Sequence, residues 1–209
     1  MDPTSPQRVL HVGCGAAAPH KLPEIFFPAG AWAEVRLDID PAVTPDIVAS
    51  ITDMSAVPDG SFDAIWSSHN LEHLPPHEVP LALAEFRRVL APHGFAAMTM
   101  PDLQQIAALI AADRLTEAAY HSPMGPITPL DMLYGHGASI AAGNGFMAHR
   151  GGFTATSLEA ALRAAGFGTV RVLRDGAYAL WASAWVANAW GDSITLAAPP
   201  VPAPLPAAA

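Results

Sequence analysis

Short apolar runs alternate along this chain with longer stretches whose apolar residues recur at helical spacing. Glycine, proline or polar residues end each run. The apolar runs predict strands at residues 8–12, 33–39, 46–50, 62–67, 95–100, 169–174 and 178–187. The amphipathic stretches predict helices at 20–27, 76–90 and 102–115, and a further helix that a capping box of Thr156 and Glu159 opens and Gly166 ends.

The order of these elements indicates an α/β fold. Strands alternate with helices as far as residue 100, which favours a parallel sheet. The Asp175-Gly176 turn between the last two runs predicts a terminal hairpin, and therefore an antiparallel edge. Residues 120–152 are rich in Gly, Pro, His and Met and predict an irregular segment, which at this length is usually functional or mobile.

Composition narrows the class of protein. The chain has 209 residues, a net charge of −9 and one cysteine, which fits a reducing cytoplasm and argues against nucleic acid as a partner. No apolar run reaches the roughly 18 residues that span a bilayer, and the N-terminus carries no signal-peptide pattern. We expect one domain over residues 1–192 and a disordered Pro/Ala-rich tail over 193–209. The oligomeric state cannot be read from the sequence.

A glycine turn follows the first strand. Gly13-Cys14-Gly15 lets the backbone turn sharply at the sheet edge where open α/β folds bind nucleotides. Asp38 ends the second strand, where a carboxylate can accept both ribose hydroxyls. Asp53 can accept a hydrogen bond from an adenine amino group, and Met54 can pack on the adenine ring. These residues together predict a nucleoside-binding site.

Four stretches carry a resemblance to a known family. They are VLHVGCGAA, LDIDP, DMSAVPDGSFDAIWSSHNLEHL and EFRRVLAPHGFAAMTMPD. With them the chain resembles the class I S-adenosylmethionine-dependent methyltransferases, most closely the bacterial type 11 group. The resemblance implies a Rossmann-like seven-stranded sheet in the order 3-2-1-4-5-7-6, with the last strand antiparallel and helices on both faces. It also implies S-adenosylmethionine as cofactor and S-adenosylhomocysteine as product.

The resemblance also assigns the cofactor-binding residues. Gly13 and Gly15 would line the methionine portion, and Asp38 would hold the ribose. The adenine would lie against Ile39, Asp53 and Met54, and the sulfonium beside Ser68 and His69. His11 belongs to this set and stands where the family usually has an acid, while Ala17 replaces a third glycine.

The histidines supply candidates for chemistry. A neutral imidazole can act as a base near pH 7, and His69 and His149 are the candidates. By resemblance, residues 102–152 form an insertion that covers the substrate; there we expect Tyr134, His136 and His149 in the substrate pocket, with His73 at its edge. His69, His73 and His77 have helical spacing, but Pro75-Pro76 would break such a helix, so a preformed metal site is not expected there. A histidine-based metal site is kept as a third hypothesis.

The favoured function is methyl transfer to a small-molecule acceptor by in-line displacement, with oxygen, nitrogen, sulfur and carbon acceptors all open. Because His11 and Ala17 depart from the family pattern, a non-catalytic S-adenosylmethionine-binding regulatory or partner protein is the alternative. The run GCGAAA also matches a degenerate dinucleotide fingerprint. The run SSHNLEHL and the terminal hairpin argue against that oxidoreductase interpretation.

Overall fold

A seven-stranded sheet forms the centre of the computed structural model, which describes residues 6–187. Its strands are β1 (Gln7–Val12), β2 (Trp32–Asp38), β3 (Ile47–Val48), β4 (Phe62–Ser68), β5 (Leu90–Pro101), β8 (Thr169–Arg174) and β9 (Ala179–Trp185). Their order is β3-β2-β1-β4-β5-β9-β8. The first five pair in parallel, and β9 is antiparallel to both β5 and β8. Counted within this sheet, the predicted order 3-2-1-4-5-7-6 with an antiparallel last strand is confirmed.

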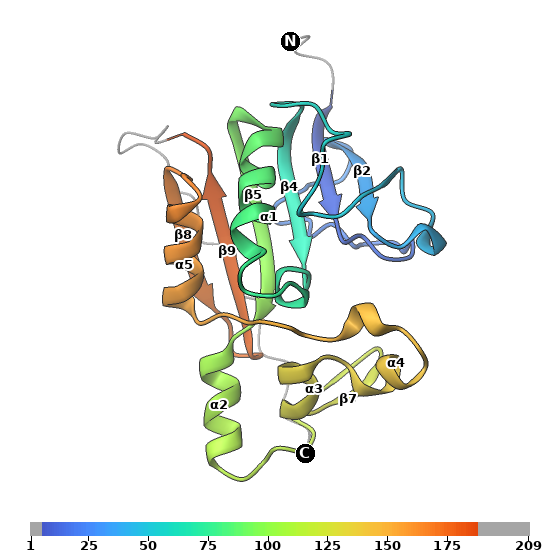
Figure 1. Ribbon diagram of the computed structural model, residues 1–209, viewed down its shortest axis with the longest axis vertical. Helices are drawn as coiled ribbons and strands as arrows, with labels where there is room; N and C mark the ends of the chain where they lie inside the picture. The colour runs from blue at the N-terminus through green and yellow to red at the C-terminus, as the bar shows by residue number, and fades with distance from the viewer. Residues whose placement is uncertain (1–5, 188–209) are drawn as a thin grey trace.

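Two helices cover one face of the sheet. Figure 1 shows α1 (Val79–Val89) and α5 (Ala155–Ala164) on the same side, in front of the strands. Leu83 and Phe86 of α1 are fully buried, as is Leu158 of α5. They belong to the main core, which also contains Ile65 and other strand residues that point to this face. The apolar residues whose spacing predicted these two helices are therefore the ones that pack into the core.

On the other face of the sheet, the described residues form turns and not a helix. The predicted helix at 20–27 is wrong, because Pro23 and Pro28 leave too few residues between them for regular helical bonding. The carbonyl of Pro23 accepts the amide hydrogens of both Phe26 and Phe27 in a tight turn. The two phenylalanines then pack with Trp66 in a second cluster. We expected helices on both faces of the sheet. The described residues place helices α1 and α5 on one face and turns on the other.

Other predicted boundaries also move. Helix α5 begins after Thr154, whose hydroxyl accepts the amide hydrogen of Ser157, so the capping box predicted at Thr156 and Glu159 is wrong. Strand β5 starts at Leu90, directly after α1, and includes the turn-like stretch 92–94. A Cβ on Gly94 would lie 2.9 Å from the carbonyl oxygen of Asp63, which explains the glycine there. The tail predicted at 193–209 lies outside the described residues.

The segment after β5 contains short regular elements. They are α2 (Leu103–Ala111), β6 (Tyr120–Ser122), β7 (Gly125–Ile127), α3 (Pro129–Tyr134), α4 (Gly137–Ala141) and the 3-10 turn η3 (Gly145–Met147). The interpretation of 120–152 as irregular is therefore wrong. Figure 1 shows this segment beyond the arrow tips of the parallel strands, at the carboxyl edge of the sheet. Ile106, Ile127 and Met132 give it a small core of its own.

The burial of α1 leads to a prediction for stability. Phe86 has no exposed surface, whereas Leu81 of the same helix is 55% exposed. Phe86→Ala leaves a cavity in the main core and should lower the free energy of unfolding by about 3–5 kcal/mol. Leu81→Ala should change it by less than about 0.5 kcal/mol. Urea unfolding of both variants tests this, and similar losses in the two would contradict the assignment of the buried face.

Candidate functional site

A cavity of about 330 Å³ lies at the carboxyl edge of the parallel strands. Its wall includes Gly13 and Gly15 after β1, Asp38 at the end of β2, and His69 after β4. Residues 144–148, from the segment after β5, close another side. The strands are parallel, so the residues that follow them meet at one edge although they are far apart in sequence.

Polar contacts fix the glycine loop on several sides. Asp38 Oδ2 accepts the amide hydrogen of Gly15 at 2.7 Å, and Arg36 donates to the carbonyl of Gly15. Lys21 Nζ donates to the carbonyl of Cys14 at 2.6 Å. Gly13 and Gly15 have φ values of +61° and +58°, which side chains other than glycine rarely adopt. The loop is thus held in a shape that requires glycine.

Asn70 closes the loop from the opposite wall. A Cβ on Gly13 would lie 2.6 Å from Asn70 Cγ, so the amide group rests directly against the glycine backbone. Asn70 lines the cavity, and its buried Nδ2 has no hydrogen-bond partner among the described residues. A buried amide donor without a partner is uncommon and is available to a ligand. No sequence signal singled out Asn70 beyond its place directly after His69.

His11 lies outside the cavity wall. Its Nδ1 donates to Glu34 Oε1 at 2.6 Å, and the imidazole is almost fully buried. Burial lowers the pKa of His11 more than the hydrogen bond and charge of Glu34 raise it. Asp38, and not His11, makes a side-chain contact to the glycine loop.

Apolar side chains form the part of the cavity wall next to Asp38. They are Leu37, Ile39, Val43 and Ile51. Asp53 is exposed and is not part of the wall, while Met54 is fully buried in the main core. Because Met54 has no exposed surface, it cannot contact a ligand in this cavity. Ile51 and Val43, which sequence reasoning missed, occupy that part of the wall instead.

His69 follows β4 in a left-handed conformation with φ +48°. Its Nδ1 lies 3.2 Å from Oε1 of Glu72, which is buried. Enclosure disfavours the charged imidazole, but the hydrogen bond and negative charge of Glu72 raise the pKa of His69 above its usual range. Burial would raise the pKa of Glu72, yet His69 and His73 lower it, so Glu72 is a carboxylate. Ser68, the last residue of β4, does not line the cavity.

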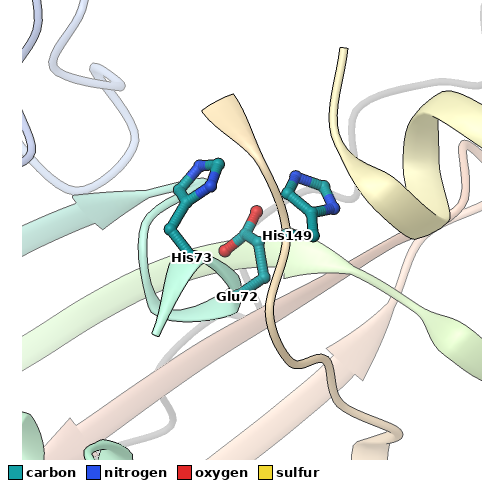
Figure 2. A group of neighbouring side chains, drawn as sticks. All are labelled: Glu72, His73 and His149. Carbon is teal, nitrogen blue, oxygen red and sulfur yellow. The ribbon is translucent and has the colours of Figure 1, made fainter. Parts of the chain in front are cut away.

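His73 and His149 meet beside Glu72, as Figure 2 shows. Their ring centroids lie 4.9 Å apart, although the residues are distant in sequence. The amide hydrogens of Arg150 and Gly151 donate to the carbonyl of Glu72 and bring this strand-like stretch against it. His73 lines the cavity and His149 does not. Burial, the largest effect, lowers the pKa of His149.

The other predicted substrate residues lie farther away. Tyr134 is 61% exposed and is not part of the cavity wall. His136 is also absent from the wall, and its Nδ1 pairs with the hydroxyl of Ser139 at the start of α4. From the same segment, residues 144–148 and Arg150 line the cavity instead. The structure therefore brings His69, His73 and His149 together, without Tyr134 and His136.

Comparison with known proteins identifies the domain. Residues 10–98 match the family model described as a methyltransferase domain, of the type 11 group. The resemblance noted from the sequence motifs is confirmed. The matched span contains the glycine loop, Asp38 and His69, so the walls of the cavity that follow β1, β2 and β4 all come from the matched residues.

Curated and solved relatives agree with this family. A stretch of 43 residues is 49% identical to the probable methyltransferase ltbC of Aspergillus luteorubrus, but it covers 20% of this chain and 15% of that protein. A methyltransferase of Methanosarcina mazei shares the fold, with a TM-score of 0.55 at 18% identity over 86% of this chain and 92% of that one. The 1,6-didemethyltoxoflavin-N1-methyltransferase of Burkholderia thailandensis, solved with S-adenosylhomocysteine, has a TM-score of 0.51 at 16% identity, covering 86% and 71% of the two chains.

The buried His11–Glu34 pair predicts a pH dependence of stability. Because folding lowers the pKa of His11 below 6.5, the unfolded chain binds a proton there before the folded protein does. The stability that neutral His11 preserves should be present above about pH 7 and decline toward about pH 5. His11→Gln removes this titration, so its unfolding free energy should fall less over the same range. Parallel pH dependences in urea unfolding would refute this.

Proposed function

We propose that this protein is an S-adenosylmethionine-dependent methyltransferase that acts on a small-molecule acceptor. The observation that carries the proposal is the fixed glycine loop beside Asp38 and His69 in one cavity. The cavity volume of about 330 Å³ falls within the range of small-molecule sites. The family of residues 10–98 supports the same chemistry.

The methyl donor would lie along the wall from Ile39 to His69. Each oxygen of Asp38 already accepts one backbone amide hydrogen, from Gly15 and Asp40, and each retains a lone pair for a ribose hydroxyl. Ile39, which is 51% exposed, gives the adenine an apolar surface together with Ile51. The methionine portion would follow Gly13 and Gly15 toward Asn70. Contacts of the donor with His11, Asp53 and Ser68 stay predictions.

The reaction itself needs alignment more than activation. A sulfonium methyl group is already electrophilic, so the protein must hold the acceptor in line with the S–CH₃ bond. An acceptor that carries a proton also needs a base, and the geometry favours His69 over His149. A carboxylate only accepts hydrogen bonds, so His69 Nδ1 donates to Glu72, and in the neutral ring Nε2 keeps the lone pair that takes a proton. His149 does not line the cavity.

The segment 102–152 would cover the acceptor, because residues 144–148 already form one wall. No helix among residues 6–187 is long and apolar enough to cross a membrane. The net charge of −9 disfavours nucleic acid as the acceptor. The cytoplasmic location rests on the single cysteine and stays a prediction.

Two glycines with similar backbone angles test the binding of the donor. Gly13 (φ +61°) lies against Asn70, whereas a Cβ on Gly30 (φ +78°) would have nothing within 4 Å of it. Gly13→Ala should weaken binding of S-adenosylhomocysteine by more than about tenfold, since it displaces both loop and amide. Gly30→Ala shares the backbone strain alone and should bind as the wild type does. Isothermal titration measures both, and a wild type that fails to bind at millimolar ligand would refute the proposed function.

A second test concerns the base. A panel of phenols, amines and thiols is first screened for release of S-adenosylhomocysteine by the wild type. With a protonated acceptor from that screen, His69→Gln should lower turnover by about a hundredfold to ten-thousandfold. Its affinity for S-adenosylhomocysteine should stay within a few fold, because Asp38 and the glycine loop are unchanged. The control His93→Gln alters an exposed residue outside the cavity wall, and equal turnover in the two variants would exclude His69 as the base.

A further inference from the structure

Three metal-ligand side chains gather beside the cavity. Glu72, His73 and His149 each offer one donor atom, and these atoms lie within 4.8 Å of one another. Figure 2 shows the carboxylate of Glu72 between the two imidazole rings. Glu72 and His73 come from the 3-10 turn η2 (Leu71–His73), and His149 comes from the segment after η3. Among the ion pairs of the described residues, Glu72 is paired only with His69.

Glu72 gives an independent sign of a missing partner. The residue is 1% exposed, and its Oε2 has no hydrogen-bond partner among the residues that the structure describes. His69 binds the other oxygen, Oε1. Burying a carboxylate oxygen without a partner is costly, so a ligand at Oε2 would remove a real penalty. The requirement is for a positively charged group or a hydrogen-bond donor.

The two histidines differ in what their ring nitrogens contact. His149 Nδ1 donates to the carbonyl of Met132 at 3.0 Å, which leaves Nε2 unprotonated in the neutral ring. The two ring nitrogens of His73 lie 3.1 Å from the carbonyls of Ala148 and His69. Both nitrogens therefore face a carbonyl oxygen, and His73 can bind an ion only if its ring turns away from one of the two carbonyls. Metal-bound histidines commonly donate their second nitrogen to a backbone carbonyl in this way.

We propose that Glu72, His73 and His149 bind a first-row divalent transition metal ion such as Zn²⁺. Two imidazoles and one carboxylate suit such an ion, whereas Mg²⁺ and Ca²⁺ prefer oxygen ligands alone. Three protein ligands leave at least one coordination position for water or substrate, as in catalytic zinc sites. His73 lines the cavity, so the site borders the space assigned to the donor and acceptor.

The backbone near His149 packs closely against the backbone of Tyr134, Glu72 and Leu74. The amide hydrogen of His149 donates to the carbonyl of Tyr134, and the next two amides donate to Glu72. A Cβ on Gly135 would lie 1.9 Å from the carbonyl oxygen of Met147, and one on Gly151 would lie 3.0 Å from that of Leu74. Glycine is therefore required at position 135, and position 151 leaves little room for a side chain. The position of His149 is fixed before any ion binds, which favours metal binding.

The metal site also narrows the acceptor, a step that rests on the proposed function. An ion beside the donor would bind an acceptor oxygen and lower its pKa, which favours a hydroxyl or phenol. The proton leaves that oxygen for His69 Nε2, and the oxygen forms its bond to the methyl carbon. The S–CH₃ bond breaks, and its electron pair stays on sulfur to give the thioether of S-adenosylhomocysteine.

Metal titration tests the site without any need for activity. The full chain, purified without a histidine tag and treated with a chelator, is titrated with Zn²⁺ by calorimetry and with Co²⁺ by visible absorption. We expect one equivalent to bind, with a Co²⁺ spectrum of imidazole and carboxylate ligation. His149→Gln should weaken binding by more than about a hundredfold, beyond the loss from an outer-sphere partner. The control His121→Gln changes an exposed histidine outside the cluster and should bind one equivalent.

The outcomes separate the two proposals. Circular dichroism is used to check that His149→Gln is folded, and Glu72→Gln provides a second variant at the site. If neither ion binds stoichiometrically, or if His149→Gln binds as tightly as the wild type, the metal site is wrong. S-adenosylhomocysteine binding by the metal-free protein tests the methyltransferase proposal separately. Methyl transfer to amines or thiols at an unchanged rate after metal removal would overturn the oxygen-acceptor assignment.

Discussion

The carboxylate of Asp38 is the contact on which the cavity depends. It joins the end of β2 to the loop after β1, by accepting the amide hydrogens of Gly15 and Asp40. Lys21, the single lysine of the chain, and Arg36 hold the loop's carbonyl oxygens from the other side. Because these contacts are made within the protein, a ligand does not have to order the loop as it binds.

The sheet could be predicted from the sequence because its signals are local. Each parallel strand is a short apolar run, and the Asp175-Gly176 turn marks the final hairpin. The prediction of a helix at 20–27 was wrong because the apolar residues there pack against Trp66 from tight turns between prolines, without forming a helix. For residues 120–152 the error was the opposite one, because regular elements were present where none had been predicted. The strands of three residues there are too short to produce a recognisable alternation.

The site could be predicted only in part. Residues with a local sequence signal were predicted, and residues without one were missed. Gly13, Asp38 and His69 were found because each follows or ends a parallel strand, and such ends share one edge. Met54 was misplaced because an apolar residue next to an acid can face a ligand or the core, and here it faces the core. The meeting of Glu72 with His149 has no local signal at all. It follows from backbone hydrogen bonds between η2 and a distant stretch.

The contacts on the two sides of the cavity differ in how many residues separate the groups that meet. The contact between Gly15 and Asp38 closes a chain loop of 23 residues, whereas that between His73 and Ala148 closes one of 75. Loop-closure entropy makes the longer closure costlier by about 1 kcal/mol. The side of the cavity that carries His149 therefore has the larger entropic cost of closure, and the donor side has the smaller one.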